Sequence, residues 1–282
     1  MTDLSTSFPI IINTSHWVGG STYVYNLGQS INLGEWACAM QSTSLSFSWP
    51  NVTAAQSNNQ FSIIMPTSTT PVTLNFTLKD GGYSIDDLND FLDFSLVKAG
   101  YYIQNVSTGQ QQVYAEFQVN PSTYQINFVS YPVPTTLPTG WTAGPNMTFP
   151  AVSVGPQLVI AQPAFGVLIG FATGTFPAVA PSTITTTGST LTPVVNPRTQ
   201  VVLQLESVWN PLASNSKVLY SFSIAGTAFS KLAVSEPKEL SFVKMQSGYH
   251  SNLTVTLCDV NLRPLEMLDK EVCIILILKK IN

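Results

Sequence analysis

Short runs in which apolar and polar residues alternate constrain this chain most. In one of them Val72, Leu74 and Phe76 occupy every second position. A period of two places neighbouring side chains on opposite faces of a β-strand, so each run predicts a strand with one buried face. Further strands are predicted over 36–49, 61–65, 113–119, 124–128, 158–171, 201–208, 218–224, 240–243, 253–258 and 272–278.

Two stretches of nearly neutral, Pro-rich sequence interrupt these strands, at about 131–157 and 176–197. Proline cannot donate a ladder hydrogen bond, so we expect long excursions there rather than central strands. The simplest architecture for the whole pattern is an all-β fold, a single jelly-roll antiparallel β-sandwich with long loop insertions. We expect one domain over 31–282, preceded over 1–30 by either an N-terminal arm or a first strand.

One segment breaks the alternation and predicts a helix over about 84–99, the only substantial helix we expect. Ser84 follows a Gly-Gly turn and forms a capping-box pattern with Asp87 three residues later. Gly100 is suited to the left-handed position that ends a helix. The residues that recur at helical spacing are Ile85, Leu88, Phe91, Leu92, Leu96 and Ala99.

The same segment carries a cluster of aspartates that raises the alternative of a calcium site. The cluster consists of Asp80, Asp86, Asp87, Asp90 and Asp93. Its spacing does not fit the calcium-binding loop in which aspartates alternate before a glycine. Carboxylates are also favourable near a helix N-terminus, which explains the cluster without a metal. We therefore predict no metal site.

The charge content argues against a nucleic-acid partner. Only 9% of residues are charged, against about a quarter in ordinary proteins, and the net charge is −4. A nucleic-acid groove needs several phosphate-neutralising cations, and Lys279-Lys280 is the only basic cluster. A surface with so little charge is tolerable when much of it is buried in an assembly.

Targeting signals and cysteines indicate a chain made in the cytosol. No basic segment followed by an apolar one marks a signal peptide, and the apolar run 272–278 is far shorter than the roughly 18 residues of a membrane span. Cys38, Cys258 and Cys273 have no paired spacing, so we expect reduced, buried thiols.

Catalytic residue patterns are missing from the sequence, so we predict no enzyme activity and no cofactor. His16 and His250 are the only histidines, and neither lies in a recognisable triad or zinc motif. Trp36 and Trp49 share the parity of core residues. Trp141 lies in the Pro-rich excursion and is the one aromatic residue we keep as a candidate exposed contact.

Four short segments, each mostly turn residues next to a strand, follow one another along the chain. The segment 80–92 reads Asp-Gly-Gly-Tyr-Ser-Ile-Asp-Asp-Leu-Asn-Asp-Phe-Leu. The others are 166–177, with Gly-Val-Leu-Ile-Gly-Phe and Gly-Thr-Phe-Pro; 210–222, ending Lys-Val-Leu-Tyr-Ser-Phe; and 259–265, Asp-Val-Asn-Leu-Arg-Pro-Leu, followed by Asp269. In this order, the four segments resemble the minor capsid (penton) proteins of virophages and of related Polinton-like and adintovirus-type DNA viruses.

This resemblance implies a single jelly roll that forms a homopentamer and closes the fivefold vertices of an icosahedral virion, in contact with the major capsid protein. The chain would then be made in the host cytoplasm and reside in the capsid. Closed rings use two different patches on each subunit. The alternative is a carbohydrate-binding or host-attachment β-sandwich, similar to a fibre head, in which exposed aromatics such as Trp141 would contact glycans.

Overall fold

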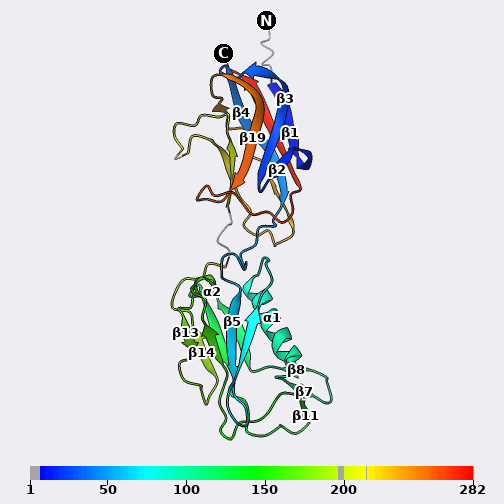
Figure 1. The fold of residues 1–282 in the computed structure, drawn as a ribbon, viewed down its shortest axis with the longest axis vertical. Coiled ribbons are helices and arrows are strands. Elements are labelled where there is room, and N and C mark those ends of the chain that lie inside the picture. The colour runs from blue at the N-terminus through cyan, green and yellow to red at the C-terminus, as the bar shows by residue number, and fades with distance from the viewer. Residues whose placement is uncertain (1–6, 196–199, 214, 282) are drawn as a thin grey trace. The chain divides into compact units, whose positions relative to one another are not determined.

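The computed structural model describes residues 7–195, 200–213 and 215–281, which form two compact units (Figure 1). Unit 1 is Met1–Pro50 with Arg198–Asn282, and unit 2 is Asn51–Pro197. The single domain expected over 31–282 therefore differs from the structure. The physical reason is that unit 2, with a hydrophobic core of its own, is inserted into one connection between two strands of unit 1.

Unit 1 is an antiparallel β-sandwich. Sheet 1 has the order β1-β20-β4-β17, with β18 also paired to β4, and sheet 2 has the order β16-β15-β19-β3-β2. The strands are β1 (Ser7–Asn13), β2 (Trp17–Gly19), β3 (Thr22–Asn32), β4 (Trp36–Ser46), β15 (Gln200–Leu205), β16 (Val218–Ser223), β17 (Leu232–Ser235), β18 (Val243–Lys244), β19 (Tyr249–Cys258) and β20 (Val272–Lys280).

The pairing of these strands is that of a jelly roll. Taking β1, β3, β4, β15, β16, β17, β19 and β20 as its eight strands, the first pairs with the eighth, the second with the seventh, the third with the sixth and the fourth with the fifth. The predicted all-β jelly-roll architecture is confirmed for unit 1. Unit 2 occupies the connection between β4 and β15, the third and fourth strands. Of the two expectations for 1–30, a first strand holds from residue 7 onwards; residues 1–6 lie outside the described residues.

The core of unit 1 lies between its two sheets. It includes Ile274 and Leu276 of β20 and Val255 and Leu257 of β19, which are all fully buried within one hydrophobic cluster. At 25 cal/mol per Å² of apolar surface, each such side chain contributes about 2 kcal/mol. Alternation along each strand thus accounts for the sandwich.

The loop that joins β19 to β20 is held by a buried carboxylate. Asp259 Oδ1 accepts the backbone N–H groups of Asn261 and Arg263 at 2.9 and 3.0 Å, and Oδ2 lies 2.9 Å from Arg263 Nη2. Burial by itself would raise the pKa of Asp259, but the hydrogen bonds from Arg263 outweigh it and lower the pKa. The Asp-Val-Asn-Leu-Arg-Pro segment therefore has a structural role, since its own hydrogen bonds and ion pair hold this loop.

Unit 2 contains three small antiparallel sheets and two helices, α1 (Ile85–Lys98) and α2 (Pro163–Ile169). The sheets are β13-β12-β5-β6, β14-β10-β9 and β11-β7-β8. Their strands are β5 (Gln60–Met65), β6 (Val72–Thr77), β7 (Ile103–Asn105), β8 (Gln111–Gln112), β9 (Ala115–Asn120), β10 (Gln125–Ser130), β11 (Trp141–Ala143), β12 (Gln157–Ile160), β13 (Gly174–Phe176) and β14 (Thr185–Gly188).

Aromatic rings fill the core of unit 2. The ring of Phe61 stacks on that of Phe165 with centroids 5.1 Å apart, and meets that of Phe117 edge-on at 5.9 Å. The two ends of the unit are fastened to each other, since Asn51 Nδ2 donates to the carbonyl of Val195 at 2.5 Å. No helix in the described part of the chain is both long enough and apolar enough to cross a bilayer.

Helix α1 is capped at both ends as its sequence predicts. Ser84 Oγ accepts the Asp87 N–H at 3.1 Å, and Asp87 Oδ2 accepts the Ser84 N–H at 2.8 Å. Gly100 follows the helix with φ +80, and a Cβ there would lie 2.9 Å from Pro145 Cγ. Glycine is therefore required both by the left-handed backbone and by close packing.

The strand predicted over 158–171 is wrong in its second half, and with it the expectation of a single helix. Strand β12 ends at Ile160, and α2 runs from Pro163 to Ile169 before Gly170 at φ +79. Phe165, Leu168 and Ile169 are buried while Val167 is 51% exposed, which is helical spacing and not alternation. Pro at the first helical position and Gly just after the last mark these ends.

The two expected excursions belong to unit 2. Residues 131–157 include β11 and contribute Val133 and Met147 to a small cluster that they share with Ile103 and Tyr114. Residues 176–195 include β14, which extends the β10–β9 hairpin as a third strand. Residues 196 and 197 lie outside the described residues.

Candidate assembly surface

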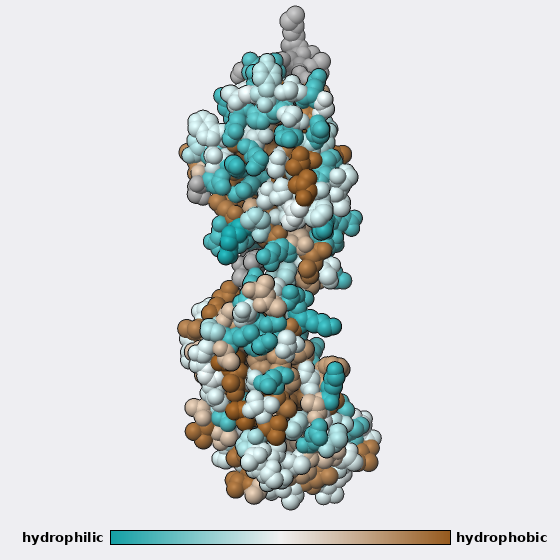
Figure 2. Space-filling view, in the orientation of Figure 1, coloured by the Kyte–Doolittle hydropathy of each residue, from teal (hydrophilic) through white to brown (hydrophobic). Residues whose placement is uncertain are grey.

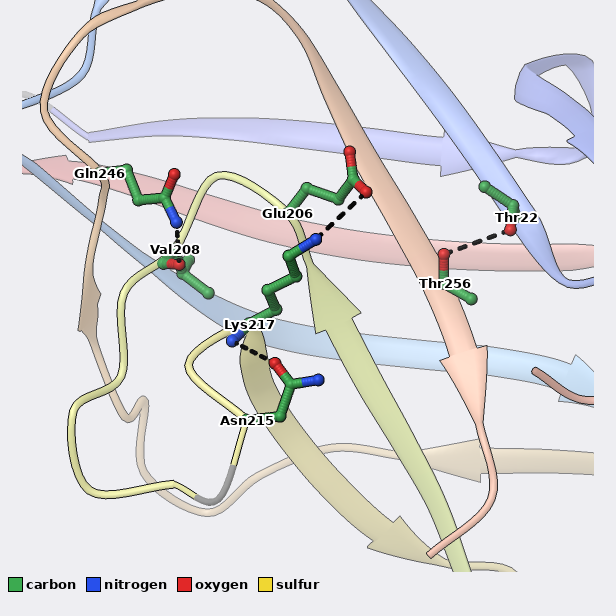
Figure 3. Close-up of polar contacts among 7 residues, drawn as sticks. All are labelled: Thr22, Glu206, Val208, Asn215, Lys217, Gln246 and Thr256. Atoms are coloured by element: carbon green, nitrogen blue, oxygen red, sulfur yellow. Dashed lines mark hydrogen bonds and ion pairs between the residues drawn. The ribbon is translucent and has the colours of Figure 1, made fainter. Parts of the chain in front are cut away.

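The outer face of sheet 2 in unit 1 is polar. Thr22 and Thr256 lie opposite each other across β3 and β19, and their hydroxyl groups are 3.2 Å apart (Figure 3). Beyond the end of β15, Glu206 Oε1 lies 3.5 Å from Lys217 Nζ, and Asn215 Oδ1 accepts the Lys217 N–H at 2.9 Å. Figure 2 shows mostly teal and pale residues on the visible face of unit 1. The outer face of sheet 2 is therefore suited to solvent exposure, as one face of an antiparallel sheet commonly is.

The outer face of sheet 1 is apolar instead. On β20, Ile274, Leu276 and Leu278 point into the core, so Cys273, Ile275 and Ile277 point outward, where they are only half-buried. Neighbouring β1 places Ile11 opposite Ile275 and Pro9 opposite Ile277. Ile11 is 51% exposed. The centre of this face and one flank therefore consist of aliphatic side chains.

The opposite flank of sheet 1 continues the apolar surface. Leu232 and Val234 of β17 lie opposite Ser46 and Ser44 of β4, and are 61% and 60% exposed. Serines, not charged residues, fill the outward positions of β4 beside them. We call the surface formed by these outward side chains the sheet-1 face; it comprises Pro9, Ile11, Leu232, Val234, Cys273, Ile275 and Ile277.

Within the strands of sheet 1, charged side chains stand at one end of the sheet-1 face, and the exposed Glu271 precedes β20 at the other end. Lys279 and Lys244 both pair with Ala37, at the end remote from Cys273. Lys279 Nζ lies over the ring of Phe242, 5.6 Å from its centroid. The rest of the face carries no charge in the strand rows that the structure describes.

The sequence signal for this face is the run Val-Cys-Ile-Ile-Leu-Ile-Leu at 272–278. A strand with one solvated face alternates, whereas a strand covered on both faces is apolar at every position. From the sequence, this run predicts a strand and is too short for a membrane span; the apolar outer face did not follow from it until the strand pairing was known.

In unit 2, the carboxyl group of Asp93 has an environment that differs from those of the other aspartates of α1. Helix α1 packs on β9, where Asn89 Oδ1 accepts the Phe117 N–H at 2.8 Å. Burial raises the pKa of Asp93 to about 6, with further contributions from Glu116 of β9 and from Asp90. Its Oδ1 is buried and has no hydrogen-bond partner among the described residues. No group of three or more metal-ligating side chains occurs in the described ranges.

Trp141 and the two histidines, singled out from the sequence, contact residues close to them in the fold. Trp141 opposes Asn105 on β7 and is half-buried against the cluster of Val133 and Met147, so its role as an exposed contact stays a prediction. His16 Nδ1 accepts the Asn13 N–H at 3.2 Å, and His250 Nε2 lies 3.2 Å from the Gln246 carbonyl. Both imidazoles therefore bond to nearby backbone groups.

A pocket of about 150 Å³ opens in unit 2 beside the β9–β10 turn. Val119, Tyr124 and Val195 are among its lining residues, and the phenol of Tyr124 is its only titratable group among the described residues. Such a lining can hold a small apolar group but supplies no acid–base pair.

All three cysteines are free thiols. Burial raises the pKa of Cys38 to about 12, and burial together with Asp259 raises that of Cys258 to about 11. Only Cys273, on the sheet-1 face, is partly accessible.

No protein-family model matches this sequence, and no curated protein matches it. Among solved structures, the crystal structure of the selenomethionine-labelled mavirus penton protein aligns with this chain at a TM-score of 0.43 and 8% sequence identity. The alignment covers 98% of this chain and 99% of the mavirus protein.

Proposed function

We propose that this chain is a structural capsid protein, a penton that acts by contact with copies of itself and with the major capsid protein, and not as an enzyme. The observation that carries the proposal is a jelly roll whose two outer faces differ: the outer face of sheet 2 is polar, and the sheet-1 face is apolar. Jelly rolls of this kind recur in viral capsid domains, where function is met by shape and contact.

The apolar sheet-1 face supports an assembled state. A monomeric sandwich gains nothing from isoleucine, leucine and valine on an outer surface, and contiguous exposed apolar patches mark interaction sites. The low content of charged residues, 9%, also supports an assembled state, because electrostatic repulsion between copies with so few charges is weak.

Three of the four segments that resemble penton proteins form identifiable structural features of this chain. The segment 80–92 forms the turn and capping box of α1, and 166–177 covers the end of α2 and the strand β13. The segment 259–265 forms the loop that Asp259 holds. The fivefold position, the homopentamer, the major-capsid partner and synthesis in the host cytoplasm come from this resemblance and belong to the proposal.

Sedimentation velocity and native mass spectrometry of the purified full chain test the proposal. A species of five copies, present alone or formed on raising the concentration, is the expected result. A strict monomer at all concentrations, combined with binding on a glycan array that is lost in Trp141→Ala, would favour the attachment-protein alternative instead.

A further inference from the structure

We propose that the sheet-1 face is the surface on which a second copy of this chain docks. The inference rests on the proposed function, since it assigns one of the two patches that a closed ring requires, and it names a surface that neither the sequence segments nor the resemblance identifies.

The exposed area of the sheet-1 face suits a subunit contact. Ile11, Leu232 and Val234 are each more than half exposed, and the outward residues of β20 add partly exposed aliphatic surface between them. Together the seven residues leave on the order of 500 Å² uncovered, comparable with the largest apolar patches found on monomers, which are often functional. A standard interface buries about 800 Å² per partner, so the face supplies the apolar centre of one.

The charge of the face favours a copy of this chain over a strongly charged partner. Serines and aliphatic residues fill the strand rows between β1 and β17, and the two lysines stand at one end. A neutral surface neither steers a charged partner nor repels another copy of itself. Depletion of charge at the centre with polar groups at the rim is the usual composition of a subunit interface.

Sheet 2 provides the internal comparison. Its outer face carries the Thr22–Thr256 hydroxyl pair and, beyond β15, the Glu206–Lys217 ion pair. The outer faces of the two sheets therefore differ in polarity, although both belong to one sandwich. The overall composition of the chain does not explain this difference.

The test uses two lysine substitutions on the flanks of the face, Val234→Lys and Ile11→Lys. Both side chains are more than half exposed, and β17 and β1 are edge strands of sheet 1, where lysine is well tolerated. Ser221→Lys is the matched control, because Ser221 is an exposed residue of β16, an edge strand of sheet 2. Circular dichroism melting of each variant verifies that the fold is kept.

We expect each flank variant to weaken self-association at least about a hundredfold, because an unpaired ammonium in a buried contact is strongly unfavourable. Ser221→Lys should assemble as the wild type does. Cys273 is a reporter within the face: its alkylation by iodoacetamide, followed by mass spectrometry, should be slow in the wild-type assembly and fast in the flank variants. Cys38 and Cys258 are buried and serve as unreactive internal references.

The outcomes separate this inference from the proposed function. A wild type that never self-associates overturns both. A wild-type pentamer that persists in both flank variants, with Cys273 still reactive, leaves the proposed function standing and overturns the inference, because the face is then free for another capsid protein. Assembly that is lost in Ser221→Lys but kept in both flank variants also overturns it, because the contact between copies would then lie on sheet 2 and not on the sheet-1 face.

Discussion

Replacing Asp93 by Asn should stabilise unit 2 at neutral pH. The Asp93 carboxyl lies where α1 packs on β9; burial, Glu116 and Asp90 together raise its pKa from 3.8 to about 6. In the unfolded chain the group ionises near pH 4, so ionising it in the folded state above pH 6 costs free energy. Stability is therefore greatest below pH 4 and falls as the pH rises through 6.

The size of the effect follows from the same pKa. A rise of about two pH units corresponds to about 3 kcal/mol, and solvent screening of a partly accessible carboxyl reduces this to roughly 1–2 kcal/mol. Asparagine keeps the shape without the charge, so the repulsion from Glu116 and Asp90 is removed. The expected gain at pH 7.5 is therefore about 1–2 kcal/mol, a factor of 5–30 in the opening equilibrium of α1.

Hydrogen–deuterium exchange read by mass spectrometry on α1 peptides measures this gain, after correction for intrinsic exchange rates. Protection in Asp93→Asn should exceed the wild type at pH 7.5, and the difference should vanish near pH 4. Asp86→Asn is the matched control: the residue is exposed on the same helix and is not among the groups that raise the pKa of Asp93, so this variant should show no gain in protection. A difference that does not change with pH, or a less protected Asp93→Asn helix, would refute the reasoning.

Two further predictions concern unit 2. Ser84→Ala should destabilise it by about 1 kcal/mol through loss of the α1 cap, whereas Ser84→Asp keeps a side-chain acceptor and should cost less; unchanged melting of Ser84→Ala would mean that the capping box contributes nothing. Because the Asn51–Val195 hydrogen bond holds the two ends of unit 2 together and the unit has its own core, residues 51–197 expressed alone should melt cooperatively by calorimetry. A fragment that shows no melting transition would contradict this.

Local features were predictable where few residues decide the structure. Ser84, Asp87 and Gly100 act through their own backbone neighbours, so the helix and both of its ends follow from the sequence. Individual strands of the jelly roll were predictable where their apolar pattern is strong, as in β19 and β20. Strand β17 was not, because its exposed Leu232 and Val234 flank a single buried Ala233.

Long-range features were not predictable from local pattern. Apolar residues at 165, 168 and 169 fit a short helix as well as a strand, and in the structure the helix brings the Phe165 ring onto that of Phe61. The division into two units depends on which strands pair across the insertion, β4 with β20 and β15 with β19, and local periodicity carries no information on this. The sheet-1 face was not predictable for the same reason. Ile11, Val234 and Ile275 lie on one face only because β1, β20, β4 and β17 pair in this order.

Electron microscopy of purified virus particles tests the central claim most directly. The account predicts that five copies of this chain occupy each fivefold vertex, with density for the jelly roll of unit 1 and contact to the major capsid protein. Vertices built from another protein, with this chain absent from the particle, would contradict it.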